Sequence, residues 1–158
     1  MRSLNMKAMS AAELEDAFGL LSAFLTADQH YRDSSSAYGD GGPEALRRAL
    51  TLFLERPELG CVWLAYNGRT AVGCCVACYA ISTAVGATVA KLDDVCVLPG
   101  HEGLGIGTAM IGGLEAGLRD RGVRRIDTSC HIENPRARDF YVRLGFRPLN
   151  EERLALLL

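Results

Sequence analysis

Two consecutive carboxylates, Asp93 and Asp94, lie in the stretch of residues 89–98, which is apolar apart from them and Lys91. A carboxylate on such a strand is costly unless it has partners or a function, so both are candidates for the general base of a proton-transfer reaction. Adjacent residues of a regular strand face opposite sides, which predicts that only one of the two reaches a given cleft. Asp93 then shares its face with Val95, and Asp94 shares its face with Cys96.

A glycine-rich segment follows this strand at the point where a helix is predicted to begin. Pro99 and Gly100 end the strand, and Gly103, Gly105 and Gly107 come next. Backbone N–H groups at a helix N-terminus favour an anion, and glycine lets the backbone approach it closely. The segment therefore predicts a diphosphate cradle, although a glycine-rich turn without a ligand fits the same residues.

Two other phosphate-binding motifs fit the segment poorly. The dinucleotide spacing G-x-G-x-x-G would need glycine at Met110 or at Thr108. A Rossmann sheet also continues through several more strand–helix units, whereas only about fifty residues remain here. A P-loop fails because no Gly-Lys-Ser/Thr follows.

A second block of regularly spaced residues lies downstream and consists of Asn134, Ala137, Tyr141, Gly145 and Phe146. Together with Gly105 and Gly107, this block resembles the signature of the GNAT N-acetyltransferase superfamily, and the resemblance covers roughly residues 89–147. In that signature a strand, an Arg/Gln-x-x-Gly-x-Gly/Ala loop and a helix precede Asn-x-x-Ala-x-x-x-Tyr-x-x-x-Gly-Phe.

The resemblance implies an N-acetyltransferase that moves an acetyl group from acetyl-CoA to a primary amine of a small molecule or peptide, by direct attack in a ternary complex. It implies that Tyr141 protonates the departing thiolate and that Asn134 contacts the cofactor arm. The residues implied for coenzyme A binding are Val95, Cys96, Val97, Gly103, Leu104, Gly105, Ile106, Gly107, Thr108, Asn134 and Tyr141.

Two positions depart from the family pattern. The usual Arg or Gln of the loop is replaced by Glu102, and a carboxylate near a diphosphate is unfavourable unless it points into solvent or pairs with a base. Some relatives carry a catalytic Glu where this chain has Ser129. These departures favour an alternative, a non-catalytic acyl-CoA-binding or interaction module on the same fold. The remaining candidates for the base are Asp93, Asp94, His131 and Glu133.

The polar segment of residues 28–42 is predicted to be a loop between two helices. In the family this region often lines the acceptor site, although a solvated loop fits the same residues. The candidates for substrate contact are His30, Tyr31, Asp33 and Tyr38.

The pattern of apolar residues predicts a mixed α/β fold in a single domain over residues 1–158. The predicted order is two helices, an antiparallel meander, and a parallel strand–helix–strand crossover. The resemblance adds the GNAT arrangement, in which the central strands splay apart. The last strands are predicted at residues 124–131 and in the tail after residue 146, where the apolar end is typical of an edge strand covered by a second copy in a homodimer.

Composition excludes several classes of protein. The net charge of −2 argues against a nucleic-acid partner, and no apolar run is long enough to span a membrane. No signal peptide is expected at the N-terminus, so a cytoplasmic location is predicted. The six cysteines lie in apolar stretches, as expected for buried thiols in a reducing compartment. No metal site is predicted, because the single C-x-x-C lacks a second ligand pair.

Overall fold

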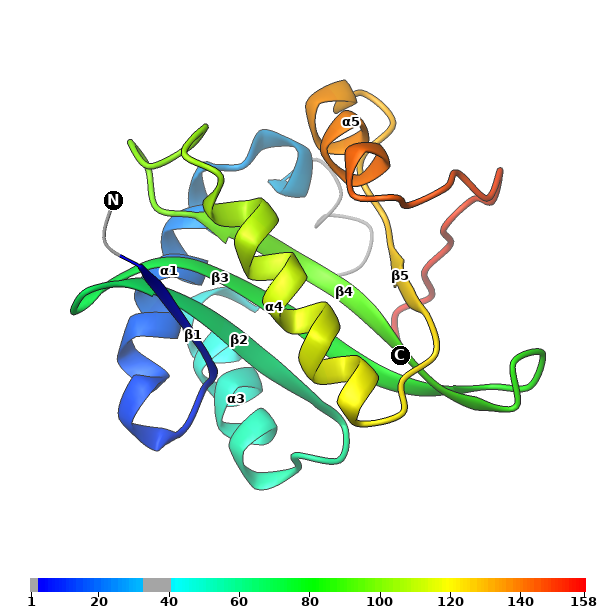
Figure 1. The fold of residues 1–158 in the computed structure, drawn as a ribbon, viewed down its shortest axis with the longest axis horizontal. Helices are drawn as coiled ribbons and strands as arrows, with labels where there is room; N and C mark the ends of the chain where they lie inside the picture. The colour runs from blue at the N-terminus through cyan, green and yellow to red at the C-terminus, as the bar shows by residue number, and fades with distance from the viewer. Residues whose placement is uncertain (1–2, 33–40) are drawn as a thin grey trace.

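The computed structural model describes residues 3–32 and 41–158, which form a five-stranded sheet with helices on both faces (Figure 1). The elements are β1 (Leu4–Ala8), the 3₁₀ turn η1 (Ala11–Glu13), α1 (Leu14–Ala27), α3 (Gly42–Glu55), β2 (Gly60–Asn67), β3 (Thr70–Ser82), β4 (Ala87–Val97), α4 (Ile106–Asp120), β5 (Ile126–Thr128) and α5 (Pro135–Arg143). The strands lie in the order β1-β2-β3-β4-β5, and only β4 and β5 are parallel. The predicted mixed α/β fold is confirmed.

Local sequence signals explain where several elements begin and end. Ser10 and Glu13 form a capping box at the entrance to the first helical segment. Pro43 lies in the first turn of α3, where its missing N–H has no helical partner to lose. Gly68, with a φ of 64°, makes the tight turn between β2 and β3.

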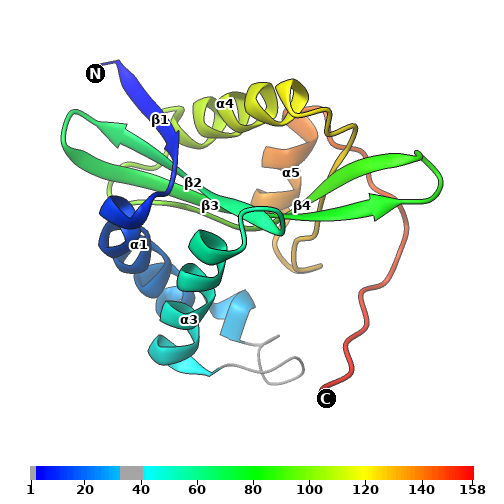
Figure 2. The same cartoon turned by 90° about the horizontal axis from the view of Figure 1, so that it is seen from below.

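The two faces of the sheet bury separate apolar clusters (Figure 2). On one face, here called the α4 face, α4 packs on Cys75, Ala77, Ala90 and Leu92. On the other, here called the α1–α3 face, α1 and α3 pack on a cluster that contains Leu64, Cys74, Val76 and Cys96. This division assigns each side chain of β4 to one side of the sheet.

The C-terminal part differs from the prediction. The strand predicted over residues 124–131 is only Ile126–Thr128, because β5 pairs with β4 at three residues before the two strands diverge. Residues 146–158, all of them described, form no strand, so the predicted tail strands are wrong. Leu154 and Leu156 remain 87% and 85% exposed. A homodimer stays a prediction.

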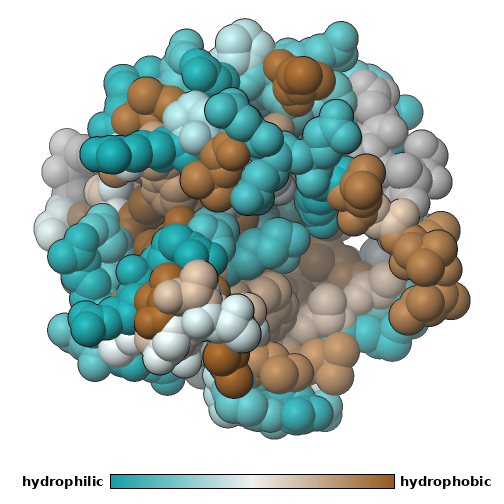
Figure 3. Space-filling model, turned by 90° about the vertical axis from the view of Figure 1, so that its right-hand side faces the viewer, coloured by the Kyte–Doolittle hydropathy of each residue, from teal (hydrophilic) through white to brown (hydrophobic). Residues whose placement is uncertain are grey.

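Some of the exposed apolar residues lie on the side of the molecule that is turned toward the viewer in Figure 3. That side shows a hollow with apolar residues around its rim. In the ribbon views it is the side from which the β3–β4 hairpin and the tail extend (Figure 1). Ile81, near the end of β3, is 85% exposed.

The segment between α1 and α3 is not a simple loop. Residues 29–32 are helical, which corrects the prediction of irregular structure from residue 28 onward. Asp28 stabilises this turn, since its carboxylate accepts the Tyr31 N–H at 2.7 Å. Two predicted substrate-contact residues, Asp33 and Tyr38, lie outside the described residues.

Candidate active site

The glycine loop after β4 has the backbone conformation that an anion cradle needs. Gly103 and Gly105 have φ values of 76° and 78°, in the left-handed region that favours glycine. α4 begins at Ile106, and the first helical bond runs from the Ala109 N–H to the Gly105 carbonyl. The N–H groups that open α4 therefore have no carbonyl acceptor within the helix, as at any helix N-terminus.

Three residues of the first turn of α4 lie next to this loop. The Ile106 side chain is buried in the core below it, whereas Thr108 is exposed. A Cβ on Gly107 would lie 3.2 Å from the Phe140 ring of α5. Glycine at this position thus lets α5 approach the start of α4.

Glu102 folds back onto the loop that carries it. Its carboxylate accepts the Gly100 N–H at 2.7 Å. Hydrogen bonds from its own backbone and from Gly100 hold the pKa of Glu102 below its ordinary value, and the nearby Arg136 charge acts in the same direction. The Glu102 carboxylate is therefore exposed to solvent and close to the basic side chain of Arg136. Both conditions weaken its repulsion of a diphosphate bound by the loop.

The free edge of β4 begins where β5 ends. β5 pairs with Ala90–Leu92 only, and β4 continues to Val97. The Leu98 N–H donates to the Val72 carbonyl on β3. Backbone groups alternate along a strand, so Cys96 also faces β3, while the N–H and C=O groups of Val95 and Val97 face the gap left by β5. This edge can accept an extended chain in strand-like pairing.

A β-bulge places Asp93 and Asp94 on the same face of the sheet. Leu92 is paired with Ala77 and Val95 with Cys75, so Val76 opposes both aspartates. Leu92 and Val95 both pack on the α4 face, and the two residues between them therefore face the α1–α3 side. The predicted strict alternation is wrong here: Asp93 does not share a face with Val95, although Asp94 does share one with Cys96.

The two carboxylates have different partners. Asp93 forms an ion pair with Lys91 at 3.0 Å and lies 3.6 Å from the Cys78 thiol. Burial raises the pKa of Asp94 to about 6, and the Asp93 charge adds to the effect, while Lys91 and Arg153 oppose it. Asp94 can therefore take up a proton in the neutral range, as a general base must.

Tyr141 lies on the α4 face beside the gap between β4 and β5. Its ring makes edge-to-face contacts with Phe140 and Phe146 at centroid distances of 5.2 and 5.4 Å. Burial raises the pKa of Tyr141 to about 12, and the nearby Asp94 charge adds a smaller contribution in the same direction. The phenol stays protonated at neutral pH and can donate a proton.

Thr128 connects this tyrosine to the end of the paired region. Its hydroxyl donates to the Leu92 carbonyl at 3.0 Å and also contacts the Tyr141 hydroxyl. Sequence reasoning missed Thr128, because nothing in a three-residue strand signals which polar side chain will meet a distant helix. Asn134 caps α5 by accepting the Ala137 N–H at 3.1 Å, as predicted. That bond uses its carbonyl oxygen and leaves the NH₂ group for another partner.

Two predicted residues meet across the site. The rings of His30 and His131 stack with a centroid distance of 4.9 Å and an interplanar angle of 30°. His131 is held in turn by the Glu133 N–H, which donates to its Nδ1 at 3.2 Å. Sequence reasoning treated His30 and His131 separately, since they are far apart in the chain.

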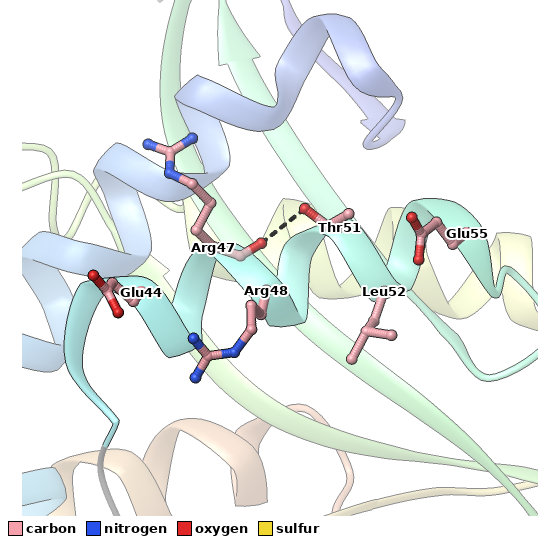
Figure 4. A pocket seen from close by; sticks show the side chains of 6 residues that line it. All are labelled: Glu44, Arg47, Arg48, Thr51, Leu52 and Glu55. Atoms are coloured by element: carbon pink, nitrogen blue, oxygen red, sulfur yellow. Dashed lines mark hydrogen bonds between the residues drawn. The ribbon is translucent and has the colours of Figure 1, made fainter.

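Two hollows elsewhere on the surface contain no predicted site residue. Figure 4 shows one of about 500 Å³, whose lining side chains all come from α3. In it the Thr51 hydroxyl donates to the Arg47 carbonyl at 2.9 Å, and the Arg47 guanidinium is paired with Glu15 at 2.6 Å. The other hollow, of about 440 Å³, lies between α1 and the start of β3. Neither brings the candidate acid and base together.

The described residues show neither a cluster of metal ligands nor a helix that could span a membrane. All six cysteines lie in the described ranges and are free thiols, and Cys74, Cys75 and Cys96 are buried. Within residues 3–32 and 41–158, no three His, Cys, Asp or Glu side chains cluster as metal ligands would. Among the described helices, none combines the length and apolar character needed to cross a membrane.

A glycine loop at a helix N-terminus thus lies beside a free strand edge where two parallel strands diverge, with the Asp94 carboxyl and the Tyr141 phenol near that edge. The model of the acetyltransferase (GNAT) family matches residues 26–146. The chain therefore belongs to the GNAT acetyltransferase family. A search of curated proteins finds no match.

Solved structures share the fold across the whole chain. An integron cassette protein from the mobile metagenome of Cole Harbour Salt Marsh is 24% identical, with a TM-score of 0.78 over 97% of this chain and 90% of that one. The aminoglycoside N-acetyltransferase AAC(6')-Iy in complex with CoA is 18% identical, with a TM-score of 0.78 over 100% and 95%. A transcriptional regulator from Bacillus halodurans C-125 is 22% identical, with a TM-score of 0.78 over 99% and 100%.

Proposed function

We propose that this chain transfers an acetyl group from acetyl-CoA to a primary amine of a small molecule or peptide, by direct attack in a ternary complex. The observation that carries the proposal is the placement of Asp94 and Tyr141 on opposite faces of the sheet beside the gap between β4 and β5. A base on one face and an acid on the other can serve the two ends of one acyl transfer. Family membership and the CoA complex of a structural neighbour support the donor.

The donor-binding residues follow from the free backbone groups. The diphosphate is bound by amides of Gly103, Leu104, Gly105, Ile106, Gly107 and Thr108. The pantetheine arm pairs with the strand edge at Val95, Cys96 and Val97, and the Asn134 NH₂ group contacts the arm. The left-handed glycines, the open helix N-terminus and the strand edge all fit such a ligand. When bound, the thioester supplies the activated acyl group.

The chemistry then uses three groups of this chain. Asp94 accepts a proton from the acceptor ammonium, because a primary amine is mostly protonated at neutral pH. The N–H of Val97, which faces the gap, donates to the thioester oxygen as negative charge develops there; the N–H of Cys96, the other candidate donor, faces β3. Tyr141 gives its proton to the sulfur as the carbon–nitrogen bond forms and the carbon–sulfur bond breaks. The nitrogen then releases its second proton to solvent, Asp94 also gives up its proton to solvent, and Tyr141 regains a proton from solvent.

The acceptor enters from the α1–α3 face, since the donor cradle and Tyr141 occupy the other side of the gap. On this face His30 and Tyr31 follow α1 directly. Asp33 and Tyr38, which lie outside the described residues, complete the proposed acceptor-binding set. His131 and Glu133 are second-choice bases. The His131 ring accepts the Glu133 N–H and stacks on His30, and both contacts hold the loop after β5.

The test is release of free thiol from acetyl-CoA in the presence of a panel of primary amines, with the acetylated product identified by mass spectrometry. We expect turnover with at least one amine and its near-complete loss in Asp94→Asn. Tight coenzyme A binding without turnover over a broad panel would contradict the proposal.

That negative result would support a second candidate, a non-catalytic acyl-CoA-binding or interaction module. One observation favours it: Glu102 places a negative charge in the loop that is proposed to bind diphosphate. Calorimetric titration with coenzyme A, run beside the thiol assay, distinguishes the two functions. An enzyme binds coenzyme A and also releases thiol from acetyl-CoA when an amine is present, whereas a binding module gives only the calorimetric signal.

A further inference from the structure

A pair of stacked imidazoles joins two segments that flank the proposed acceptor side. His30 lies in the helical turn after α1, and His131 lies three residues beyond β5. Their ring centroids are 4.9 Å apart. In Figures 1 and 2 the segment after α1 lies beside the connection from β5 to α5. The contact thus bridges the α1–α3 face and the loop at the open end of β5.

The two rings differ in how their nitrogens are satisfied. His131 Nδ1 accepts the Glu133 N–H at 3.2 Å, so this ring is anchored through one of its nitrogens. His30 Nδ1 is buried and has no hydrogen-bond partner among the described residues. Buried polar atoms are nearly always paired, and an unpaired one therefore points to a missing partner.

The chemistry of an imidazole limits what that partner can be. A neutral histidine has one donor and one acceptor nitrogen, and a hydroxyl can both donate and accept. A hydroxyl therefore satisfies His30 Nδ1 in either tautomer. An anionic group is disfavoured, because Asp93 and Asp94 lie on the same face of the sheet.

We propose that His30 Nδ1 binds a hydroxyl group of the acceptor, so that the preferred acceptors are hydroxylated primary amines, and that His131 is a positioning residue that holds the His30 ring by stacking. This inference rests on the proposed function, and it names the substrate class of the same site. The reacting amine then lies near Asp94, and the hydroxyl lies at the other end of the acceptor.

The experiment compares two matched acceptors, an ω-amino alcohol and the n-alkylamine with the same number of heavy atoms, over a series of chain lengths. For the unmodified protein we expect a higher kcat/KM with the amino alcohol at one chain length. His30→Phe keeps an aromatic ring for the stack but lacks Nδ1. We expect it to reduce the preference by about three- to ten-fold, through a higher KM for the amino alcohol with kcat unchanged.

Variants of the second ring separate positioning from direct contact. His131→Phe retains a stacking ring and should keep the preference, whereas His131→Ala should lose much of it. Thermal melting of each variant checks that the fold is intact. An unchanged preference in His30→Phe, or no preference at any chain length in the unmodified protein, overturns the inference.

A further measurement keeps the inference separate from the proposed function. If neither acceptor is acetylated although coenzyme A binds, the transferase proposal fails. Imidazole ¹⁵N spectra recorded during titration with the amino alcohol then test the pair directly. A shift of the His30 Nδ1 signal that the alkylamine does not produce supports the site, and the absence of such a shift overturns it.

Discussion

Asp93 and Asp94 are consecutive residues whose side chains lie on the same face of the sheet, because both oppose Val76 across a β-bulge. Their proximity keeps the two negative charges together, which helps to raise the pKa of Asp94 to about 6. Asp93 is paired with Lys91 at 3.0 Å, whereas burial is the largest cause of the raised pKa of Asp94. The bulge thereby makes one of two similar carboxylates suitable as a base near neutral pH.

The pH dependence of turnover follows from this arrangement. Asp94 must be ionised to accept a proton, so kcat/KM should fall as the pH decreases through about 6. Asp94→Asn should lower kcat/KM by about 10²- to 10⁴-fold and abolish this inflection. Asp93→Asn is the matched control: it removes the neighbouring charge, and the inflection should move to lower pH while turnover at neutral pH persists. An unchanged profile in Asp94→Asn would assign the base elsewhere.

The contribution of Asp94 to the free energy of unfolding should decrease with rising pH, whereas activity should increase. The folded-state pKa of Asp94 lies above its ordinary value of 3.8, so the folded protein binds this proton more tightly than the unfolded chain does. The contribution of Asp94 to stability therefore falls as the pH rises from about 4 to about 6. Asp94→Asn should raise the free energy of unfolding at pH 7 by about 1 to 2 kcal/mol, with little difference below about pH 4. Urea denaturation at the two pH values measures this; equal effects at both would contradict it.

Tyr141→Phe tests the proposed acid. The phenyl ring preserves the contacts with Phe140 and Phe146, and only the hydroxyl is lost. We expect kcat to fall by about ten- to a hundred-fold, while the Kd for coenzyme A measured by calorimetry stays the same. Tyr79→Phe is the control, since the Tyr79 hydroxyl accepts from Arg121 away from the gap. Equal turnover in both variants would remove Tyr141 from the acid role.

Glu102→Gln tests the unusual loop carboxylate. The amide oxygen can still accept the Gly100 N–H, but the negative charge is gone. The Kd for coenzyme A should decrease by about three- to ten-fold at low ionic strength, and the difference should shrink as salt is added. Glu44→Gln, on the exposed surface of α3, should have no effect. Weaker binding by Glu102→Gln would show that the carboxylate supports the loop more than it opposes the ligand.

Several features could be predicted from the sequence because short-range interactions produce them. The capping box at Ser10, the Asn134 cap of α5 and the left-handed glycines after β4 each depend on a few neighbouring residues. The spacing of Asn134, Tyr141 and the glycine pair was enough to indicate the family, which the match over residues 26–146 then established.

The orientation of Asp93 was decided by tertiary structure alone. It depends on the register between β3 and β4, where one extra residue on β4 reverses the alternation that a regular strand would have. The short β5 and the absence of a strand in the described tail also depend on where β4 and β5 diverge. The stack of His30 on His131 requires two distant segments to meet, and no local pattern specifies such a contact. Sequence thus determined which groups are available, and long-range pairing determined which of them face one another.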